Sequence, residues 1–168
     1  LQADVKMPIH HTEHNPYVEA SWKWWPDLYR DLHTFRITGG EPLLSKDTWK
    51  ILDFIIDHPN PNKKLNLAIN SNLGIPDNLV DKFIEKIKII EDRGLVNEFI
   101  IFTSVDTWGA QAEYIRNGLE FNKFWDNMNK VLTASPRVNI TVMSTFNALS
   151  IPSYKKLVDG VYGLKEEY

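Results

Sequence analysis

Apolar and polar residues alternate in four short segments of the chain, and a longer segment with helical spacing follows each of the first three. The alternating segments, each predicted to form a β-strand, are residues 33–38, 64–70, 97–106 and 137–147. Their first residues are 31 to 40 positions apart, which is the length of a strand followed by a crossover helix. This spacing predicts an α/β fold with a parallel sheet.

Apolar residues recur every three or four positions between the predicted strands, which is typical of helices packed on a sheet. Residues 45–58 begin with Ser45, a favourable helix cap, and residues 76–94 begin with Pro76 and end with glycine. The same spacing predicts helices over residues 17–25, followed by Pro26 where a kink would fall, and 120–132.

Each predicted strand has one apolar face and one polar or mixed face. The apolar faces can pack against helices. The polar faces, richest near the carboxyl ends of the strands, carry Arg36, Thr38, Asn66, Asn70, Glu98, Ser104, Asp106, Asn139, Thr141, Thr145 and Asn147. Because parallel strands between two helix layers are usually apolar on both faces, this pattern favours a barrel or half-barrel whose mouth holds a polar ligand. The alternative is a sheet with one solvated face.

Composition narrows the possible partners. The chain has 168 residues and a net charge of −3, and its lysines are scattered, so we expect no nucleic-acid partner. No apolar run approaches the roughly 20 residues that span a bilayer, and no signal segment opens the sequence. We therefore expect no membrane association and a cytoplasmic location. A single domain is predicted, with a leading loop (1–16), βα units (17–160) and a tail (161–168).

The stretch RITGGEPLLS, residues 36–45, contains the strongest candidate for chemistry. Gly39 and Gly40 follow a predicted strand, where ligands bind in parallel α/β folds. Glycine lets the backbone approach a ligand closely. Glu41 adds a carboxylate that can only accept hydrogen bonds when ionised, which suits an ammonium or a hydroxyl group.

The string FRITGGEPLL resembles the GGEP motif of the radical S-adenosylmethionine superfamily. In that family the motif ends the second strand of a partial (β/α)6 barrel and holds the amino group of the methionine moiety. Four further segments resemble other parts of the family core: AINSN (68–72), FTSVDTW (102–108), residues 112–132 and VNITVMSTFN (138–147). The resemblance covers roughly residues 17–160, and the GGEP string is its most specific part.

The resemblance implies a pocket for the small-molecule cofactor S-adenosylmethionine and an unknown substrate. Gly40 and Glu41 would contact the cofactor's ammonium group, beside Gly39, and Ser104 and Asp106 would contact its ribose or carboxylate. Ser71, Asn72 and Asn147 would line the pocket. The family's reaction, hydrogen abstraction by a 5′-deoxyadenosyl radical, also requires a reduced 4Fe-4S cluster.

The sequence departs from the family at the cluster. The family holds it through C-x3-C-x2-C after the first strand, and this chain has no cysteine. We expect that the sequence is an incomplete core of about four βα units, whose first and last units are missing. A cluster-free binding module is the alternative. The two free sheet edges of such a piece predict low stability and self-association through an edge strand.

Two other functions have weaker support in the sequence. His10, Glu13 and His14 match the spacing H-x-x-E-H of inverted zincins, but Pro8 and Pro16 leave barely two helical turns between them. An ordinary barrel lyase or aldolase would need a Schiff-base lysine or metal ligands at a strand end, and the sequence offers neither. We therefore predict no metal site in this chain.

Overall fold

The computed structural model describes residues 15–60 and 64–168, which belong to two compact units, Leu1–Leu32 and His33–Tyr168. The first unit contains helix α1, Pro16–Asp31. The side chain of Asn15 caps it by accepting hydrogen bonds from the backbone N–H groups of Tyr17 and Val18. The predicted helix is confirmed, and it continues through Pro26 to Asp31.

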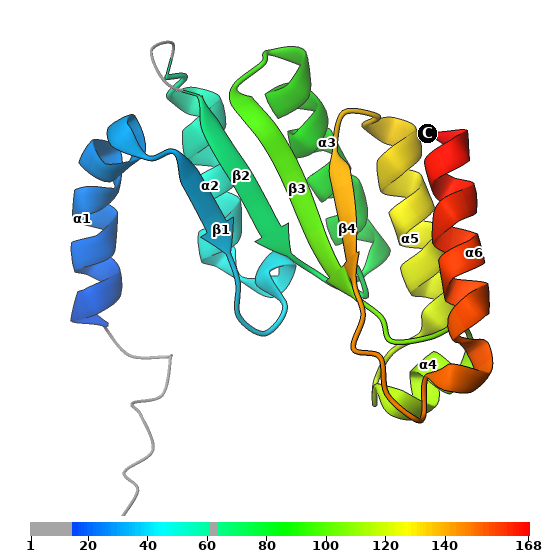
Figure 1. Cartoon of the computed structure of the whole chain (residues 1–168). Helices are drawn as coiled ribbons and strands as arrows, with labels where there is room; N and C mark the ends of the chain where they lie inside the picture. Colours follow the sequence, from blue (N-terminus) through cyan, green and yellow to red (C-terminus); the bar gives the residue numbers. More distant parts are fainter. Residues whose placement is uncertain (1–14, 61–63) are drawn as a thin grey trace, which may run out of the picture. The chain divides into compact units, whose positions relative to one another are not determined.

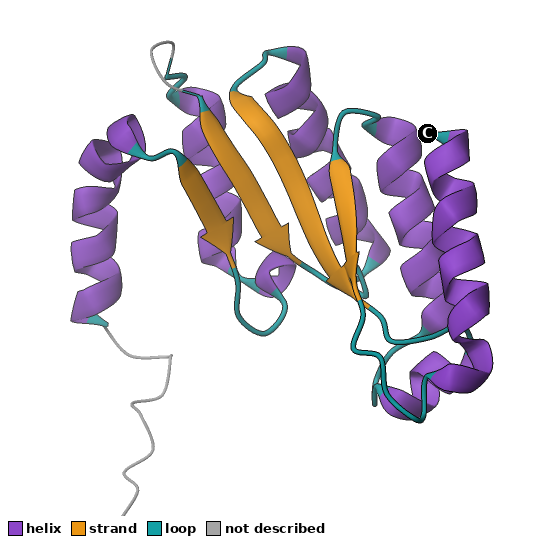
Figure 2. Ribbon diagram, in the orientation of Figure 1, coloured by secondary structure: helices purple, strands orange, loops and turns teal. Residues whose placement is uncertain are grey.

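The second unit contains a sheet of four parallel strands in the order of the sequence (Figures 1 and 2). The strands are β1 (Thr34–Ile37), β2 (Leu65–Asn70), β3 (Val96–Ser104) and β4 (Asn139–Met143). All three pairings are parallel, so the prediction of an α/β fold with a parallel sheet is confirmed. In the described part of the chain the sheet is open, with β1 and β4 as its edges.

Helices connect the strands, as the apolar spacing predicts. The elements after β1 are a short 3-10 helix η1 (Pro42–Leu44), α2 (Lys46–Asp57), α3 (Asp77–Asp92), α4 (Ala110–Ile115), α5 (Phe121–Ala134) and α6 (Ile151–Glu167). Helices α2, α3 and α5 match predicted segments. Within residues 15–60 and 64–168, no helix combines the length and the apolar character needed to cross a bilayer.

The core lies between one face of the sheet and helices α2, α3 and α5, which cover that face (Figure 1). The predicted apolar face of β2 is buried, with Leu67 and Ile69 fully inaccessible. The ring of Phe83 on α3 packs edge-on against Phe99 on β3, with centroids 6.1 Å apart. The predicted division into apolar and polar strand faces therefore holds in the structure.

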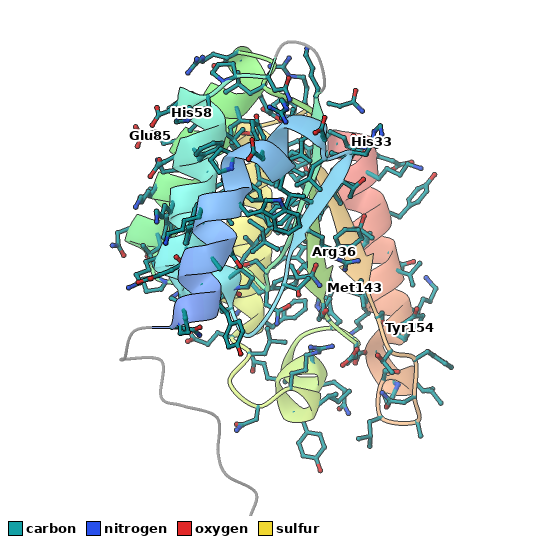
Figure 3. The ribbon with its side chains drawn as sticks, turned by 90° about the vertical axis from the view of Figure 1, so that its left-hand side faces the viewer. His33, Arg36, His58, Glu85, Met143 and Tyr154 are labelled. Carbon is teal, nitrogen blue, oxygen red and sulfur yellow. The ribbon has the colours of Figure 1, made fainter. Side chains whose placement is uncertain are left out.

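The opposite face of the sheet carries no helix from the described residues of this unit (Figures 1 and 3). Its side chains are exposed or half-buried, apart from Ala68. Arg36, Asn70, Phe102 and Met143 lie on this surface, which we call the open face. In the described part of the chain the four strands form an open sheet, and its membership of a partial barrel stays a prediction.

Helix α6 lies beside α5 near the β4 edge (Figure 1), and it was not predicted. Its sequence contains Pro152, Gly160 and Gly163, which are all unfavourable in a helix interior except for proline in the first turn. Gly160 faces the aromatic cluster formed by Trp108 and Trp125, whose ring centroids are 4.6 Å apart. The glycine that weakens helix propensity therefore permits the close packing of α6.

Replacing Gly160 with alanine should destabilise the protein. The added Cβ would lie 2.4 Å from the ring of Trp108 and 3.0 Å from that of Trp125. We expect Gly160→Ala to lower the free energy of unfolding, measured in urea, by about 1–3 kcal/mol. Gly163→Ala is the control, because no atom lies within 4 Å of its added Cβ, and it should raise stability by up to about 1 kcal/mol. Equal effects of the two substitutions would contradict the packing argument.

Candidate functional site

The loop after β1 contains one glycine that the fold requires and one that it does not. Gly39 has φ of +134°, a conformation that side chains disfavour. Gly40 has no such φ, and no heavy atom lies within 4 Å of the position a Cβ would take. Neither conformation nor packing among the described residues therefore demands glycine at position 40, and the space beside its Cα is open.

Glu41 connects this loop to the end of β2. Its Oε1 accepts a hydrogen bond of 3.1 Å from the backbone N–H of Leu43 and caps η1. Its Oε2 accepts one of 3.2 Å from the backbone N–H of Asn72. Because a carboxylate oxygen can accept about two hydrogen bonds, each oxygen of Glu41 retains one acceptor position among the residues that the structure describes.

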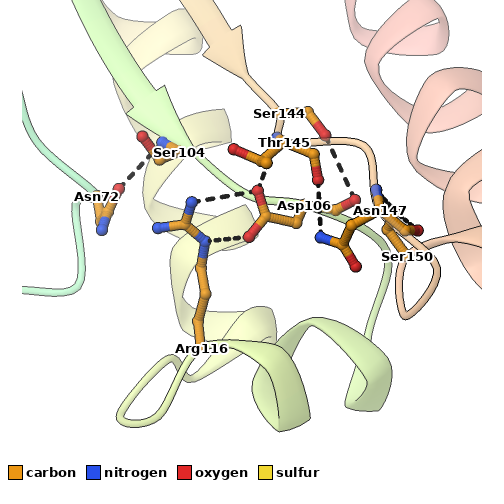
Figure 4. Close-up of polar contacts among 8 residues, drawn as sticks. All are labelled: Asn72, Ser104, Asp106, Arg116, Ser144, Thr145, Asn147 and Ser150. Atoms are coloured by element: carbon orange, nitrogen blue, oxygen red, sulfur yellow. Dashed lines mark hydrogen bonds and ion pairs between the residues drawn. The ribbon is translucent and has the colours of Figure 1, made fainter.

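Asn72 extends the connection to β3. Its Oδ1 accepts a hydrogen bond of 3.0 Å from the backbone N–H of Ser104 (Figure 4). The predicted site residues Glu41, Asn72 and Ser104 are therefore joined across the carboxyl ends of three neighbouring strands. Ser71 has a local role instead: it is 2% exposed, and its hydroxyl accepts a hydrogen bond from the N–H of Leu73 within the turn.

Asp106 holds two loops together after β3. Its carboxylate accepts hydrogen bonds from Arg116 Nε at 2.9 Å and Nη2 at 3.2 Å, and a third from the N–H of Thr145 at 2.9 Å (Figure 4). Burial alone would raise the pKa of Asp106, but hydrogen bonds from Arg116 and Thr145 and the charge of Arg116 outweigh it and hold this pKa below its usual value. Asp106, only 5% exposed, is therefore an ionised anchor for Arg116.

Asn147 uses its side chain within its own loop. Its Nδ2 donates to the carbonyl of Thr145 at 3.0 Å, and its Oδ1 accepts from the N–H of Leu149 at 2.9 Å. The hydroxyl of Ser150 accepts from the Asn147 N–H at 2.9 Å. These bonds shape the connection between β4 and α6, and they leave few polar positions of Asn147 for a ligand.

A cavity of about 270 Å³ opens at the carboxyl end of the sheet. Two acidic and two basic side chains line it, together with uncharged residues. The lining consists of Glu41, Leu44, Asn72, Gly74, Arg116, Asn117, Gly118, Leu119, Glu120 and Lys123. Small-molecule sites usually measure about 300–1,000 Å³, so this cavity matches a part of such a ligand. A zwitterionic group would find a partner for each of its charges.

Only two of the predicted site residues, Glu41 and Asn72, line this cavity. Arg116 and Lys123 line the cavity but were not predicted as site residues. A signal for Arg116 existed, because the turn at Arg116, Asn117 and Gly118 lies in a segment that resembles the family. No sequence signal pointed to Lys123, because a lone lysine on a helix is usually a solvated side chain.

The histidine motif lies outside this description. His10, Glu13 and His14 are not among the described residues. Across residues 15–60 and 64–168, no group of three or more His, Cys, Asp or Glu side chains is placed to hold a metal ion.

No family model, curated protein or solved structure matches this chain. A function is therefore inferred from the motif and from the geometry of the strand ends.

The pair formed by Asp106 and Arg116 should stabilise the fold. Asp106→Asn removes the buried charge that faces Arg116, and we expect it to lower the free energy of unfolding by about 1–3 kcal/mol near neutral pH. The control is Asp92→Asn. Asp92 pairs with Arg137 at 3.7 Å and both side chains are more than half exposed, so this change should cost at most about 1 kcal/mol.

This effect should depend on pH in a defined direction. Because the folded-state pKa of Asp106 is lowered, its stabilisation is fully present above the unfolded value of about 3.9. It is lost as the pH falls through the folded-state pKa. Urea unfolding should therefore show the full difference between wild type and Asp106→Asn near neutral pH and a shrinking difference below about pH 4. A difference that grows on acidification would contradict the assignment.

Proposed function

We propose that residues 33–168 form the cofactor-binding part of a radical S-adenosylmethionine enzyme. The cofactor's ammonium group would bind beside Gly40 and Glu41, at the carboxyl end of β1. The observation that carries this proposal is the combination of a glycine that the fold does not require with a carboxylate that has free acceptor positions. In the family that this motif resembles, the same string holds the amino group of the methionine moiety.

The residues present suit the amino acid portion of the cofactor. An ammonium group donates three hydrogen bonds, and Glu41 offers an acceptor position on each oxygen. The cavity of about 270 Å³ also contains Arg116 and Lys123, two cations that could face the carboxylate. A partial (β/α) barrel would use the open face of the sheet as its interior, and that face adjoins the same strand ends.

Asp106 has a different part in this proposal from the one that the resemblance implies. With three hydrogen bonds from the protein on its two oxygens, its carboxylate has little capacity left for a ribose hydroxyl. We assign it a positioning role: it holds Arg116, which lines the cavity. Ser104 is half-buried at the end of β3 and stays a candidate for direct contact.

The 4Fe-4S cluster does not fit the residues of this chain, which has no cysteine. In a radical S-adenosylmethionine enzyme, its ligands would therefore have to come from residues outside this sequence. The same fact favours the second candidate function, a cluster-free module that binds S-adenosylmethionine without radical chemistry. Both candidates share the cofactor pocket.

The assigned partner of Glu41 can be tested by calorimetry. Glu41→Gln removes the negative charge and keeps an oxygen acceptor for one of the two backbone N–H groups, those of Leu43 and Asn72, that Glu41 binds. We expect it to weaken the binding of S-adenosylmethionine about tenfold or more, since a charge-assisted hydrogen bond contributes about 1.5–3 kcal/mol. Binding of 5′-methylthioadenosine, which has no ammonium group, should change much less.

The control variant is Glu85→Gln, on the exposed surface of α3 away from the open face (Figure 3). It should leave both affinities unchanged. An unchanged affinity of Glu41→Gln for S-adenosylmethionine would refute the contact with the ammonium group. An equal loss for both ligands would mean that Glu41 acts only by shaping the loop.

A further inference from the structure

The open face of the sheet contains an arginine on β1 that contacts side chains of the other three strands. Arg36, on β1, donates a hydrogen bond of 2.7 Å from Nε to Asn70 Oδ1 on β2. Its guanidinium carbon lies 4.0 Å from the ring centre of Phe102 on β3. Its Nη2 lies 3.9 Å from Met143 Sδ on β4. The contacts of this one side chain therefore link all four strands.

These contacts fix the guanidinium without neutralising it. The ring of Phe102 attracts the cation, while the hydrogen bond of Nε to Asn70 sets its direction. Within residues 15–60 and 64–168, Arg36 makes no ion pair with a carboxylate, whereas Arg116 makes a bidentate pair with Asp106. Its remaining N–H groups have no stronger partner among the described residues than the weakly accepting sulfur of Met143.

We propose that Arg36 binds the carboxylate of a small-molecule ligand on the open face. A planar fork of N–H donors matches a carboxylate better than any other side chain does. The loss of side-chain freedom, which usually opposes such binding, is already reduced by the contacts with Asn70 and Phe102. The contact of Arg36 with a carboxylate does not depend on the pocket at Glu41, and only its assignment to the methionine carboxylate rests on the proposed function.

The contacts of Arg36 place its guanidinium near the carboxyl ends of the strands, because Asn70 and Met143 are the last residues of β2 and β4. Two sources of the carboxylate are compatible with this position: the methionine moiety of S-adenosylmethionine, or a separate acid. The same experiment distinguishes them.

The methyl signals of the methionines report whether a carboxylate binds near Arg36. The chain has three methionines: Met143 contacts Arg36, Met128 is 1% exposed and lines the other side of the sheet on α5, and Met7 lies outside the described residues. In the full chain with 13C-labelled methionine methyl groups, titration with succinate at constant ionic strength should shift the Met143 signal saturably. The Arg36 Nε–H signal should shift with it, and Met128 should not shift.

Two variants of Arg36 and one control define the contact. Arg36→Gln should abolish the saturable shift of Met143, and Arg36→Lys, which keeps the charge but loses the planar fork, should weaken succinate binding about tenfold. Arg137→Gln, an exposed arginine already paired with Asp92, should leave the titration unchanged. An unperturbed Met128 signal verifies the fold of each variant.

Competition with S-adenosylmethionine identifies the source of the carboxylate. Displacement of succinate would assign Arg36 to the methionine carboxylate, and simultaneous binding of both would assign it to a separate acid. The absence of a saturable shift at Met143, or an equal shift in Arg36→Gln, would overturn the proposal and leave the stack on Phe102 as a structural contact. Glu41→Gln should not alter the succinate titration, so failure of the cofactor pocket and failure of this site are distinguishable.

Discussion

The parallel pairing of the four strands in sequence order is the constraint on which the rest of the structure depends. Each strand must be reached by a crossover from the end of the previous one, and crossovers of the same hand place their helices on the same face. Helices α2, α3 and α5 therefore cover one face of the sheet, and the other stays open among the described residues of this unit. The same pairing brings all four carboxyl ends to one edge, where Glu41, Asn72, Ser104 and Asp106 gather.

Hydrogen bonds at that edge convert separate loops into one connected site. Glu41 accepts from the backbone of Asn72, Asn72 accepts from the backbone of Ser104, and Asp106 joins Arg116 to the loop after β4. Most of these bonds use a side chain of one loop and the backbone of another, so they fix loop positions while leaving other groups accessible. A polar site of this kind can be preorganised without a covering helix layer.

The periodicity of the sequence predicted most of the fold because each strand has one apolar face and one polar or mixed face. Leu67 and Ile69 alternate with Asn66 and Asn70, and this pattern gave both the strand and its buried face. Helix α6 was missed because Gly160 and Gly163 lower its helix propensity, and the packing of Gly160 against Trp108 joins distant parts of the chain. The site was predictable at its motif and at the end of the next strand. Glu41 and Asn72 line the cavity, but nothing local indicates that Arg116 pairs with Asp106, or that Ser71 and Asn147 bond within their own turns.

Binding of S-adenosylmethionine at the strand ends near Gly40 and Glu41, as we propose, is tested most directly by an amide chemical-shift map of the 15N-labelled chain titrated with that compound. We expect saturable shifts that centre on the backbone N–H groups of Gly40, Asn72 and Ser104. The absence of saturable shifts, or shifts confined to the surfaces of α2 and α3, would contradict it.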